Sequence, residues 1–240
     1  MSKSFTIILD QTSHPGNIGA AARAMKTMGI EDLRLVNTTS AQHPDAYAMA
    51  SGADDILFHA KLYDKLTPAL DDIELLFGLS ARKRSQYRHC IYSHELGDIL
   101  AKHPQHNKIG FLFGNEQSGL DNTALSYCQY QVLVPTNPKF SSLNLAACVQ
   151  LISYICHTTQ LTKNDAVTTM KPPIAQGQYL AMVEMLHSII KNTNMHNEQL
   201  ASQTEQRLRQ IVLHSGLNQT EIDLIMGILK QLSVLSTPKN

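Results

Sequence analysis

The sequence of 240 residues has no tryptophan, only four cysteines and no excess of either charge, with 20 basic and 20 acidic side chains. The balanced charge excludes a histone-like protein that binds nucleic acid through bulk basicity. The cysteines form no C-x-x-C pair and no zinc-ligand spacing, so we expect reduced thiols, a cytoplasmic protein and no metal site. Hydrophobic residues make up 43% of the chain, which is enough for a folded core.

Long apolar segments are also scarce. The first apolar run has five residues before Asp10 and is too short for an export signal, so we expect no export. Residues 140–162 carry no charged side chain and are long enough to cross a bilayer, but lipid would leave Asn144, Gln150 and His157 poorly satisfied. The sequence therefore predicts a helix buried in protein and no membrane partner.

Short apolar, β-branched runs alternate with helical patterns from residue 5 to about residue 160, which is typical of an α/β fold with a parallel sheet. The predicted strands are 5–9, 33–36, 56–58, 73–79, 108–113 and 131–134. The predicted helices are 17–28, 45–52, 61–70, 94–103, 121–127 and 142–159.

A polar, threonine-rich stretch with Pro172 and Pro173 interrupts the helical patterns. We therefore predict a large domain at residues 1–160, a linker at 161–177 and a small all-α domain at 178–240. Its predicted helices are 178–190, 198–215 and 220–235, with Gly216 ending the second and Asn218 or Thr220 capping the third. Because so small a unit buries little by itself, we expect it to lean on the large domain, a partner subunit or a ligand.

Three segments place glycine, proline or a capping residue beside a functional side chain directly after a predicted strand, where α/β sheets bind ligands. In residues 14–23, Asn17 is expected to cap the helix that carries Arg23. A dinucleotide site is disfavoured, because G-x-G-x-x-G is incomplete and Asn37 stands where an acidic residue is expected. A tight turn with a surface arginine is the alternative.

The other two segments are FGNEQSGL at residues 113–120 and the proline-rich loop at 134–145. Glycines at both ends of the first hold Glu116 in a turn, although an ordinary loop with a solvated glutamate is the alternative. In the second, Ser142 and Asn144 open an uncharged helix whose free N–H groups could accept a ligand, or they are plain capping residues. We expect Asn144 to be a buried amide that needs partners.

In this order, N-x-G-x-x-x-R, F-G-x-E-x-x-G-L and P-x(5)-S-S-x-N resemble the three motifs of SpoU-type SPOUT RNA methyltransferases. The resemblance implies a parallel sheet with a deep trefoil knot and a homodimer formed by the knotted domain, with the site near the subunit interface. It also implies S-adenosylmethionine as the cofactor. The residues expected to hold it are Leu79, Ser80, Ala81, Gly114, Val134, Pro135, Ser141, Ser142 and Leu143.

Longer matches, T-S-H-x-G-N-x-G-x-x-A-R-A-M-K-T-M-G among them, resemble the branch of this family that acts on tRNA. They imply methylation of the ribose 2′-hydroxyl of cytidine or uridine at nucleotide 32 of the anticodon loop; another tRNA or rRNA site is the alternative. Asn115 and Thr136 depart from the motifs expected for this branch and for the family.

The resemblance also implies the roles of the catalytic residues. Arg23 would bind the phosphate beside the target and favour loss of the 2′-hydroxyl proton through its charge. Asn17 and Glu116 would hold Arg23 and the ribose in place. Ser142 would lie near the attacking oxygen, and Asn144 would brace its loop.

Arg82, Arg84 and Arg88 form a basic cluster with no acidic residue between Leu79 and Tyr92. We expect this cluster to bind tRNA phosphates, although a solvated loop is the alternative. Lys191, Arg207 and Arg209 are weaker candidates for distal tRNA contacts. The competing functions are a non-catalytic RNA-binding module and an α/β enzyme for another nucleotide. No Walker motif or G-x-S-x-G elbow supports the latter.

Overall fold

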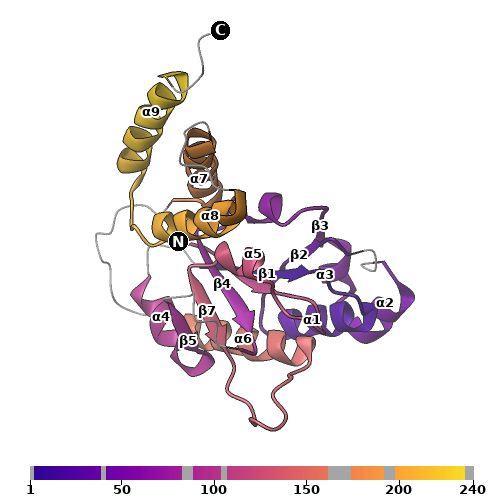
Figure 1. Cartoon of the computed structure of the whole chain (residues 1–240). Helices are drawn as coiled ribbons and strands as arrows, with labels where there is room; N and C mark the ends of the chain where they lie inside the picture. The colour runs from indigo at the N-terminus through magenta and orange to yellow at the C-terminus, as the bar shows by residue number, and fades with distance from the viewer. Residues whose placement is uncertain are drawn as a thin grey trace.

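The computed structural model describes residues 3–38, 42–82, 89–103, 107–161, 174–191 and 198–235. Within them, one sheet of seven parallel strands has the order β3-β2-β1-β6-β4-β7-β5 (Figure 1). Its strands are β1 (Ser4–Asp10), β2 (Asp32–Val36), β3 (Lys61–Tyr63), β4 (Leu75–Ser80), β5 (Cys90–Tyr92), β6 (Lys108–Phe113) and β7 (Tyr130–Leu133). The predicted α/β class is confirmed.

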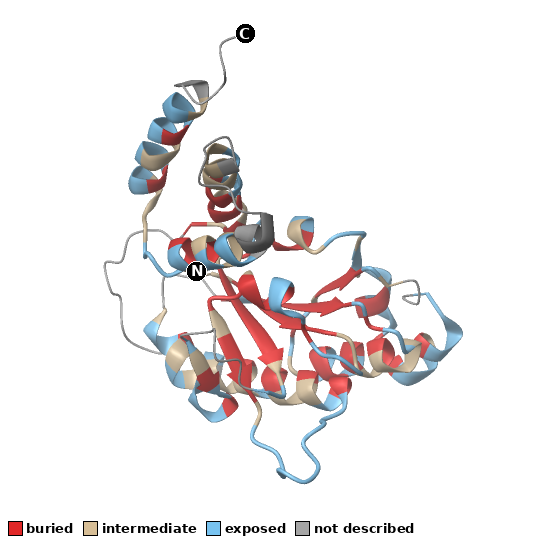
Figure 2. Ribbon diagram, in the orientation of Figure 1, coloured by how far each residue is buried: buried red, intermediate tan, exposed pale blue. Residues whose placement is uncertain are grey.

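Helices pack on both faces of the sheet, so the central strands are buried (Figure 2). One face carries α1 (Pro15–Thr27), α2 (Pro44–Ala50), α3 (Asp54–Phe58), α4 (Leu96–Lys102), which follows the short turn η2 (Ser93–Glu95), and α6 (Leu145–Leu161). The opposite face carries the short helices η1 (Thr67–Leu70) and α5 (Asn122–Ser126). Both faces of the parallel sheet are therefore covered, as such sheets require.

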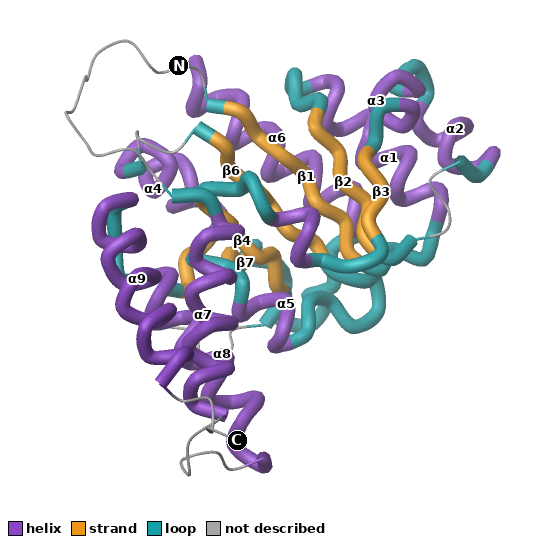
Figure 3. Tube along the Cα trace, turned by 90° about the horizontal axis from the view of Figure 1, so that it is seen from above, coloured by secondary structure: helices purple, strands orange, loops and turns teal. Residues whose placement is uncertain are grey.

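The chain turns to opposite faces after two neighbouring strands. The helix after β1 is α1 and the helix after β6 is α5, and they cover different faces. The loops at the carboxyl ends of β1 and β6 therefore diverge, which opens a crevice at this edge of the sheet. Figure 3 shows the strands from above, with the connecting loops gathered at one edge.

One predicted strand and one predicted helix are wrong. Residues 56–58 lie in α3, and the strand that pairs with β2 begins at Lys61, where a helix was expected. A short apolar run fits either a strand or a buried helical turn, and here Ile56 and Leu57 are buried while Phe58 is 79% exposed. The three-residue strand β5 was not predicted; the other predicted strands are confirmed.

The C-terminal unit consists of α7 (Gln176–Lys191), α8 (Glu198–Leu213) and α9 (Gln219–Leu235), close to the predicted bounds. Asn218 caps α9: its Oδ1 accepts from the Glu221 N–H at 3.2 Å, and the Glu221 carboxylate accepts from the Asn218 N–H at 2.8 Å. Gly216 has a left-handed φ of 65°, in accord with its expected position after a helix.

This unit docks on α5 and the start of β7, which confirms that it leans on the large domain. Arg209 of α8 is 6% exposed and donates to Ser126 Oγ at 2.7 Å, with its guanidinium 4.0 Å from the centre of the Tyr127 ring. The expectation of a tRNA contact at Arg209 is therefore wrong, because this side chain is buried in the docking contact.

The trefoil knot stays a prediction. Among the helices of the described residues, none is long and apolar enough to cross a membrane.

Candidate active site

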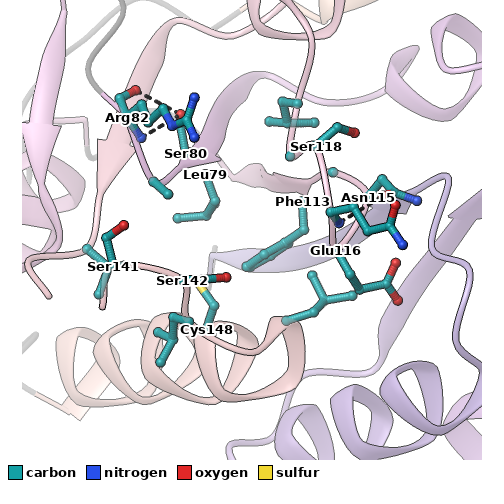
Figure 4. A pocket seen from close by; sticks show the side chains of 18 of the residues that line it. Leu79, Ser80, Arg82, Phe113, Asn115, Glu116, Ser118, Ser141, Ser142 and Cys148 are labelled. Atoms are coloured by element: carbon teal, nitrogen blue, oxygen red, sulfur yellow. Dashed lines mark hydrogen bonds between the residues drawn. The ribbon is translucent and has the colours of Figure 1, made fainter. Parts of the chain in front are cut away.

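A cavity of about 360 Å³ lies at the carboxyl ends of β4, β6 and β7. This volume suits a small organic ligand. Three loops build most of its wall (Figure 4). They contribute Leu79, Ser80, Ala81, Arg82, Phe113, Gly114, Asn115, Glu116, Gln117, Ser118, Gly119, Leu120, Val134, Thr136, Ser141, Ser142 and Leu143, and α6 adds Leu145 and Cys148. We call this space the cofactor cavity.

The cavity brings together nearly all the residues that the sequence marks for a cofactor. They come from segments spread over more than sixty residues of the chain, and those that line the wall are Leu79, Ser80, Ala81, Gly114, Val134, Ser141, Ser142 and Leu143. Pro135 does not line the wall, although Val134 and Thr136 on either side of it do. Thr136 Oγ1 donates to the Ser141 carbonyl at 3.2 Å and closes the loop that carries both residues.

The loop after β6 folds back tightly on itself. The Gly119 N–H donates to the Asn115 carbonyl at 2.8 Å, and Gly119 has a left-handed φ of 68°. A Cβ atom on Gly114 would lie 2.3 Å from the Gly119 carbonyl carbon. Only glycine at position 114 therefore allows the loop to close and its backbone to face the cavity.

Glu116 ties this loop to the start of α1. Its carboxylate accepts from Ser13 N–H at 3.1 Å, Ser13 Oγ at 3.0 Å, His14 N–H at 3.2 Å and Asn17 Nδ2 at 3.0 Å. Partial burial alone would raise the pKa of this carboxyl, but the hydrogen bonds from Asn17, Ser13 and His14 outweigh burial and lower the pKa to about 2. Glu116 is therefore a fixed negative acceptor rather than a proton donor.

Asn17 continues this network to the third segment. Asn144 Nδ2 donates to Asn17 Oδ1 at 3.1 Å, while Asn144 Oδ1 accepts from the Ala146 N–H at 2.9 Å and the Ala147 N–H at 3.3 Å. Glu116, Asn17 and Asn144 thus join the three sequence motifs through side-chain hydrogen bonds. Their partners lie 99 and 127 residues apart in the chain.

Two local expectations for these amides are wrong. The N-cap of α1 is His14, and Asn17 lies inside the first turn, where its side chain is free to reach Glu116. Helix α6 begins at Leu145, three residues later than predicted, so Asn144 is an exposed residue before the helix rather than a buried amide. Its oxygen satisfies the first helical N–H groups that were expected to receive a ligand.

Arg23 is exposed on α1 and does not line the cofactor cavity of its own chain. The expected contact of Arg23 with Asn17 and Glu116 is not formed, since the hydrogen bonds of these two side chains within the described residues go to Ser13, His14 and Asn144. Arg82 lines the cavity wall, and its N–H donates to Ser80 Oγ at 3.3 Å. Arg84 and Arg88 lie outside the described residues.

Sequence reasoning missed Cys148 and Ser13. Cys148 is four residues after Asn144, so the helical repeat would have placed it on the same face of α6. Burial raises the pKa of its thiol to about 12, so Cys148 is a neutral wall residue and not a nucleophile. Ser13 gave no sequence signal, because its partner Glu116 is 103 residues away.

The cavity fits S-adenosylmethionine. Leu79, Leu120, Val134 and Leu143 give the wall apolar surface, while Asn115, Gln117 and Ser118 give it polar groups. This combination matches a half-apolar, half-polar molecule.

The fold, the cavity and the linked motifs together define a SPOUT-type methyltransferase. Residues 4–154 match the SpoU rRNA methylase family, and the chain belongs to this family. A SpoU methyltransferase from Streptomyces viridochromogenes, AviRb in complex with AdoMet, shares the fold at a TM-score of 0.55 and 20% identity, covering 68% of this chain and 60% of AviRb.

Closer relatives extend the similarity over the C-terminal helices. The chain is 33% identical over 97% of its length to the tRNA (cytidine/uridine-2′-O-)-methyltransferase TrmJ of Photorhabdus laumondii, of which it covers 98%. It is 34% identical over 94% of its length to the tRNA (cytidine/uridine/adenosine-2′-O-)-methyltransferase TrmJ of Pseudomonas aeruginosa, of which it covers 92%. The crystal structure of TrmJ from Z. mobilis matches at a TM-score of 0.83 and 30% identity, covering 95% of this chain and 98% of that one.

Proposed function

We propose that this protein transfers the methyl group of S-adenosylmethionine to a ribose 2′-hydroxyl of tRNA, on cytidine or uridine at nucleotide 32 of the anticodon loop. The observation that carries the proposal is the hydrogen-bonded chain Glu116–Asn17–Asn144 beside the cofactor cavity. The similarity to two TrmJ enzymes over nearly the whole chain supports tRNA as the substrate. All four cysteines are free thiols, which supports our proposal that the protein acts in the cytoplasm.

When bound, S-adenosylmethionine supplies a methyl group on a sulfonium, and the chain has to align the 2′-hydroxyl with it. Glu116 and Asn17 fix the loop between β1 and α1 against the loop after β6. The loop that lines the cofactor cavity and the loop that leads to Arg23 are therefore held in a fixed relative position, which favours alignment of the two reactants. Ser142 lines the cavity and would hydrogen-bond the attacking oxygen. Arg23 would bind the adjoining phosphate and stabilise the developing alkoxide, and the proton would leave to that phosphate or to water.

Because Arg23 does not line the cavity of its own chain, we infer that it acts on the cavity of a second copy in a homodimer. Thr27 Oγ1 donates to Gln150 Oε1 of α6 at 3.5 Å. Arg23 lies four residues before Thr27, so it belongs to the same side of α1, the side that faces α6. Tyr154 on α6 is 54% exposed, and α6 is the uncharged helix expected at the interface. A copy packed on this side would carry its Arg23 toward the neighbouring cavity.

Mixing two inactive variants tests this arrangement. Arg23→Ala removes the guanidinium, and Gly114→Ala blocks the cofactor loop, because its Cβ would meet the Gly119 backbone. If Arg23 acts across the dimer, one site in each mixed dimer is intact, and re-associated mixtures recover on the order of a quarter of wild-type turnover. If Arg23 acts within its own chain, the mixture stays inactive. Circular dichroism of each variant confirms folding.

We propose further that Arg82, Arg84 and Arg88 bind anticodon-loop phosphates; of the three, Arg82 lines the cavity. Arg82→Glu should weaken tRNA binding several-fold at low salt, with a smaller effect at high salt, because phosphate contacts release counterions. Filter binding against a salt series measures the effect, with Lys230→Glu, an exposed cation of α9 to which no role is assigned, as the control. Equal affinities of wild type and Arg82→Glu for tRNA at every salt concentration would show that Arg82 does not bind tRNA.

The decisive experiment for the activity is incubation of the full chain with bulk tRNA and labelled S-adenosylmethionine, followed by nucleoside mapping. Label in 2′-O-methylcytidine or 2′-O-methyluridine at nucleotide 32 is the expected result, and label elsewhere refutes the proposed position.

We also propose the domain bounds 1–160 and 178–240, joined by a linker at 161–177; limited proteolysis should cut inside the linker.

A further inference from the structure

A second cavity, of about 370 Å³, lies beside the cofactor cavity on the same edge of the sheet. It covers the carboxyl ends of β1 and β2 and the residues after β3, while the cofactor cavity covers those of β6, β4 and β7. The residues of its wall are Asp10, Gln11, Val36, Asn37, Asp64, Lys65, Leu66, Thr67, Asp121, Thr123, Ala124 and Tyr127. We call it the acidic cavity.

Only a thin wall separates the two cavities. Asn115 of the cofactor cavity donates through Nδ2 to the carbonyl of Gln11, which lines the acidic cavity, at 2.8 Å. Leu120 and Asp121 are consecutive residues, one in each wall. One hydrogen bond and one peptide bond therefore mark the boundary, which coincides with the reversal of strand order between β1 and β6.

Hydrogen-bond acceptors dominate the acidic cavity. The wall carries three carboxylates, Asp10, Asp64 and Asp121, and one cation, Lys65. One oxygen of Asp121 already accepts from the Ala124 N–H at 2.6 Å as the N-cap of α5. Asp10 is 7% exposed although it lines the wall, and the side-chain hydrogen bond to it among the described residues comes from neighbouring Gln11. A carboxylate has about four acceptor positions, so Asp10 can still accept from a ligand. Burial and the charge of Asp121 raise the pKa of Asp10 to about 6.

The carboxylates do not converge on a point. Among the described residues, no group of three histidine, cysteine or acidic side chains is placed to hold a metal ion. The wall also includes Val36, Leu66, Ala124 and the Tyr127 ring, which offer apolar surface. A flat organic group with hydrogen-bond donors on its edge fits this combination better than a hydrated cation.

We propose that the acidic cavity receives the base of the nucleotide that is methylated and favours a base with an exocyclic amino group, such as cytosine, over uracil. The methyl donor then occupies the cofactor cavity and the target ribose lies over the boundary at Gln11 and Asn115. A carboxylate accepts from the cytosine amino group, whereas uracil presents a carbonyl oxygen at the same position. The inference rests on the proposed function, because it assigns the base of that substrate.

Two tRNA transcripts that differ only in C or U at the methylated position test the proposal with the full chain. The measured quantity is the ratio of kcat/KM on the C transcript to that on the U transcript. We expect a ratio above one for wild type and a fall of about tenfold in Asp10→Asn, whose amide can donate to uracil. Asp64→Asn, at an exposed position, should lower the ratio less, and Glu31→Gln, an exposed charge outside the cavity, should leave it unchanged.

The ratio is internal to each variant, so a partly unfolded sample does not alter it. A wild-type ratio of one or below, or a ratio unchanged in both Asp10→Asn and Asp64→Asn, overturns the assignment of the base. A loss that is equal on both transcripts and restored by spermidine or Mg²⁺ would make the cavity a cation site and also overturns it. If wild type methylates neither transcript while it binds S-adenosylhomocysteine, the proposed function itself fails.

Discussion

The Glu116 carboxylate holds two loops together that come from different parts of the chain. It accepts hydrogen bonds from Ser13, His14 and Asn17 at the start of α1, and it lines the cofactor cavity. A side chain with so many donors around it has its charge and position fixed before any ligand arrives. We therefore expect Glu116 to act as a positioning residue, which organises the loops rather than moving a proton.

Glu116→Gln should weaken the site without unfolding the protein. The amide replaces one acceptor oxygen with an NH₂ group that faces other donors, so we expect a loss of about 1 kcal/mol in the free energy of unfolding near neutral pH, after allowance for solvent screening. S-adenosylhomocysteine affinity should fall several-fold. Urea unfolding and calorimetric titration measure the two effects, with Glu31→Gln as a control at an exposed position.

The same substitution has a definite pH dependence. The pKa of Glu116 falls from 4.5 to about 2 on folding, so its ionised form stabilises the fold above pH 4.5, and this stabilisation is lost as pH falls toward 2. The difference in unfolding free energy between wild type and Glu116→Gln should therefore shrink across this interval. A difference that is constant from pH 7 to pH 2 would contradict the role of the charge.

Single residues also mark how far the sequence could predict the site. The motifs marked Arg23, Asn17, Glu116 and Asn144 as candidate functional residues, but they did not predict which contacts these side chains make. The Asn17–Glu116 and Asn17–Asn144 hydrogen bonds join residues about a hundred positions apart, and no local pattern encodes such a pairing. Asn17 was expected to cap a helix for the same reason: local preference favours a cap, and a distant partner outweighs it.

At the scale of elements, the orientation of α1 depends on a close contact with α2. Gly19 faces the backbone of Ala46, and a Cβ atom at position 19 would lie 1.9 Å from the Ala46 carbonyl oxygen. The two helices therefore pack backbone to backbone. Because α1 carries both Asn17 and Arg23, this contact sets where these two side chains point.

Gly19→Ala should push α1 and α2 apart. Overpacking costs about 1–3 kcal/mol, which exceeds the gain of about 1 kcal/mol that alanine brings inside a helix. We expect a lower melting temperature and a loss of methyl transfer larger than the loss of S-adenosylhomocysteine affinity, since α1 does not line the cofactor cavity. Gly227→Ala is the matched control, because Gly227 lies in α9 with open space around it. A Gly19→Ala protein as stable and active as wild type would contradict the close contact.

Element types were predictable where the hydrophobic pattern was long, and failed where it was short. The strands at the centre of the sheet carry continuous apolar runs, as buried parallel strands do. Edge strands β3 and β5 have three residues each, and such short segments carry no period that separates a strand from a helical turn. The start of α6 was misplaced because Ser142 is as good a cap as Asn144 by residue type; in the structure Asn144 accepts from the first helical N–H groups and also donates to Asn17.

At the scale of the whole molecule, α8 of the C-terminal unit joins the α5 end of the site domain through polar contacts, while the start of α7 bonds to the backbone of Ile73 and Asp71. Arg209 and Gln210 of α8 donate to Ser126, and Gln210 also donates to the Cys128 carbonyl at 3.3 Å. The helices themselves were predictable from periodicity, but the docking was not. The partner of Arg209 is 83 residues away, and an arginine on a helix looks the same in sequence whether it faces solvent or Ser126.

Arg209→Met should loosen this docking while the helix keeps its shape. Methionine fills much of the same volume but loses the hydrogen bond to Ser126 and the contact of the guanidinium with the Tyr127 ring, at a cost of about 1–3 kcal/mol. Arg209 also pairs with Glu205 within α8 at 2.7 Å, so the cost falls on α8 and on its docking contact. Amide hydrogen exchange should therefore accelerate in α8 and α5 and stay unchanged in β1 and β6. Arg207→Met, at an exposed position on the same helix, should exchange like wild type. Acceleration throughout the sheet would mean that the C-terminal unit and the site domain unfold as one, and unchanged exchange in α8 would mean that other contacts hold the two together.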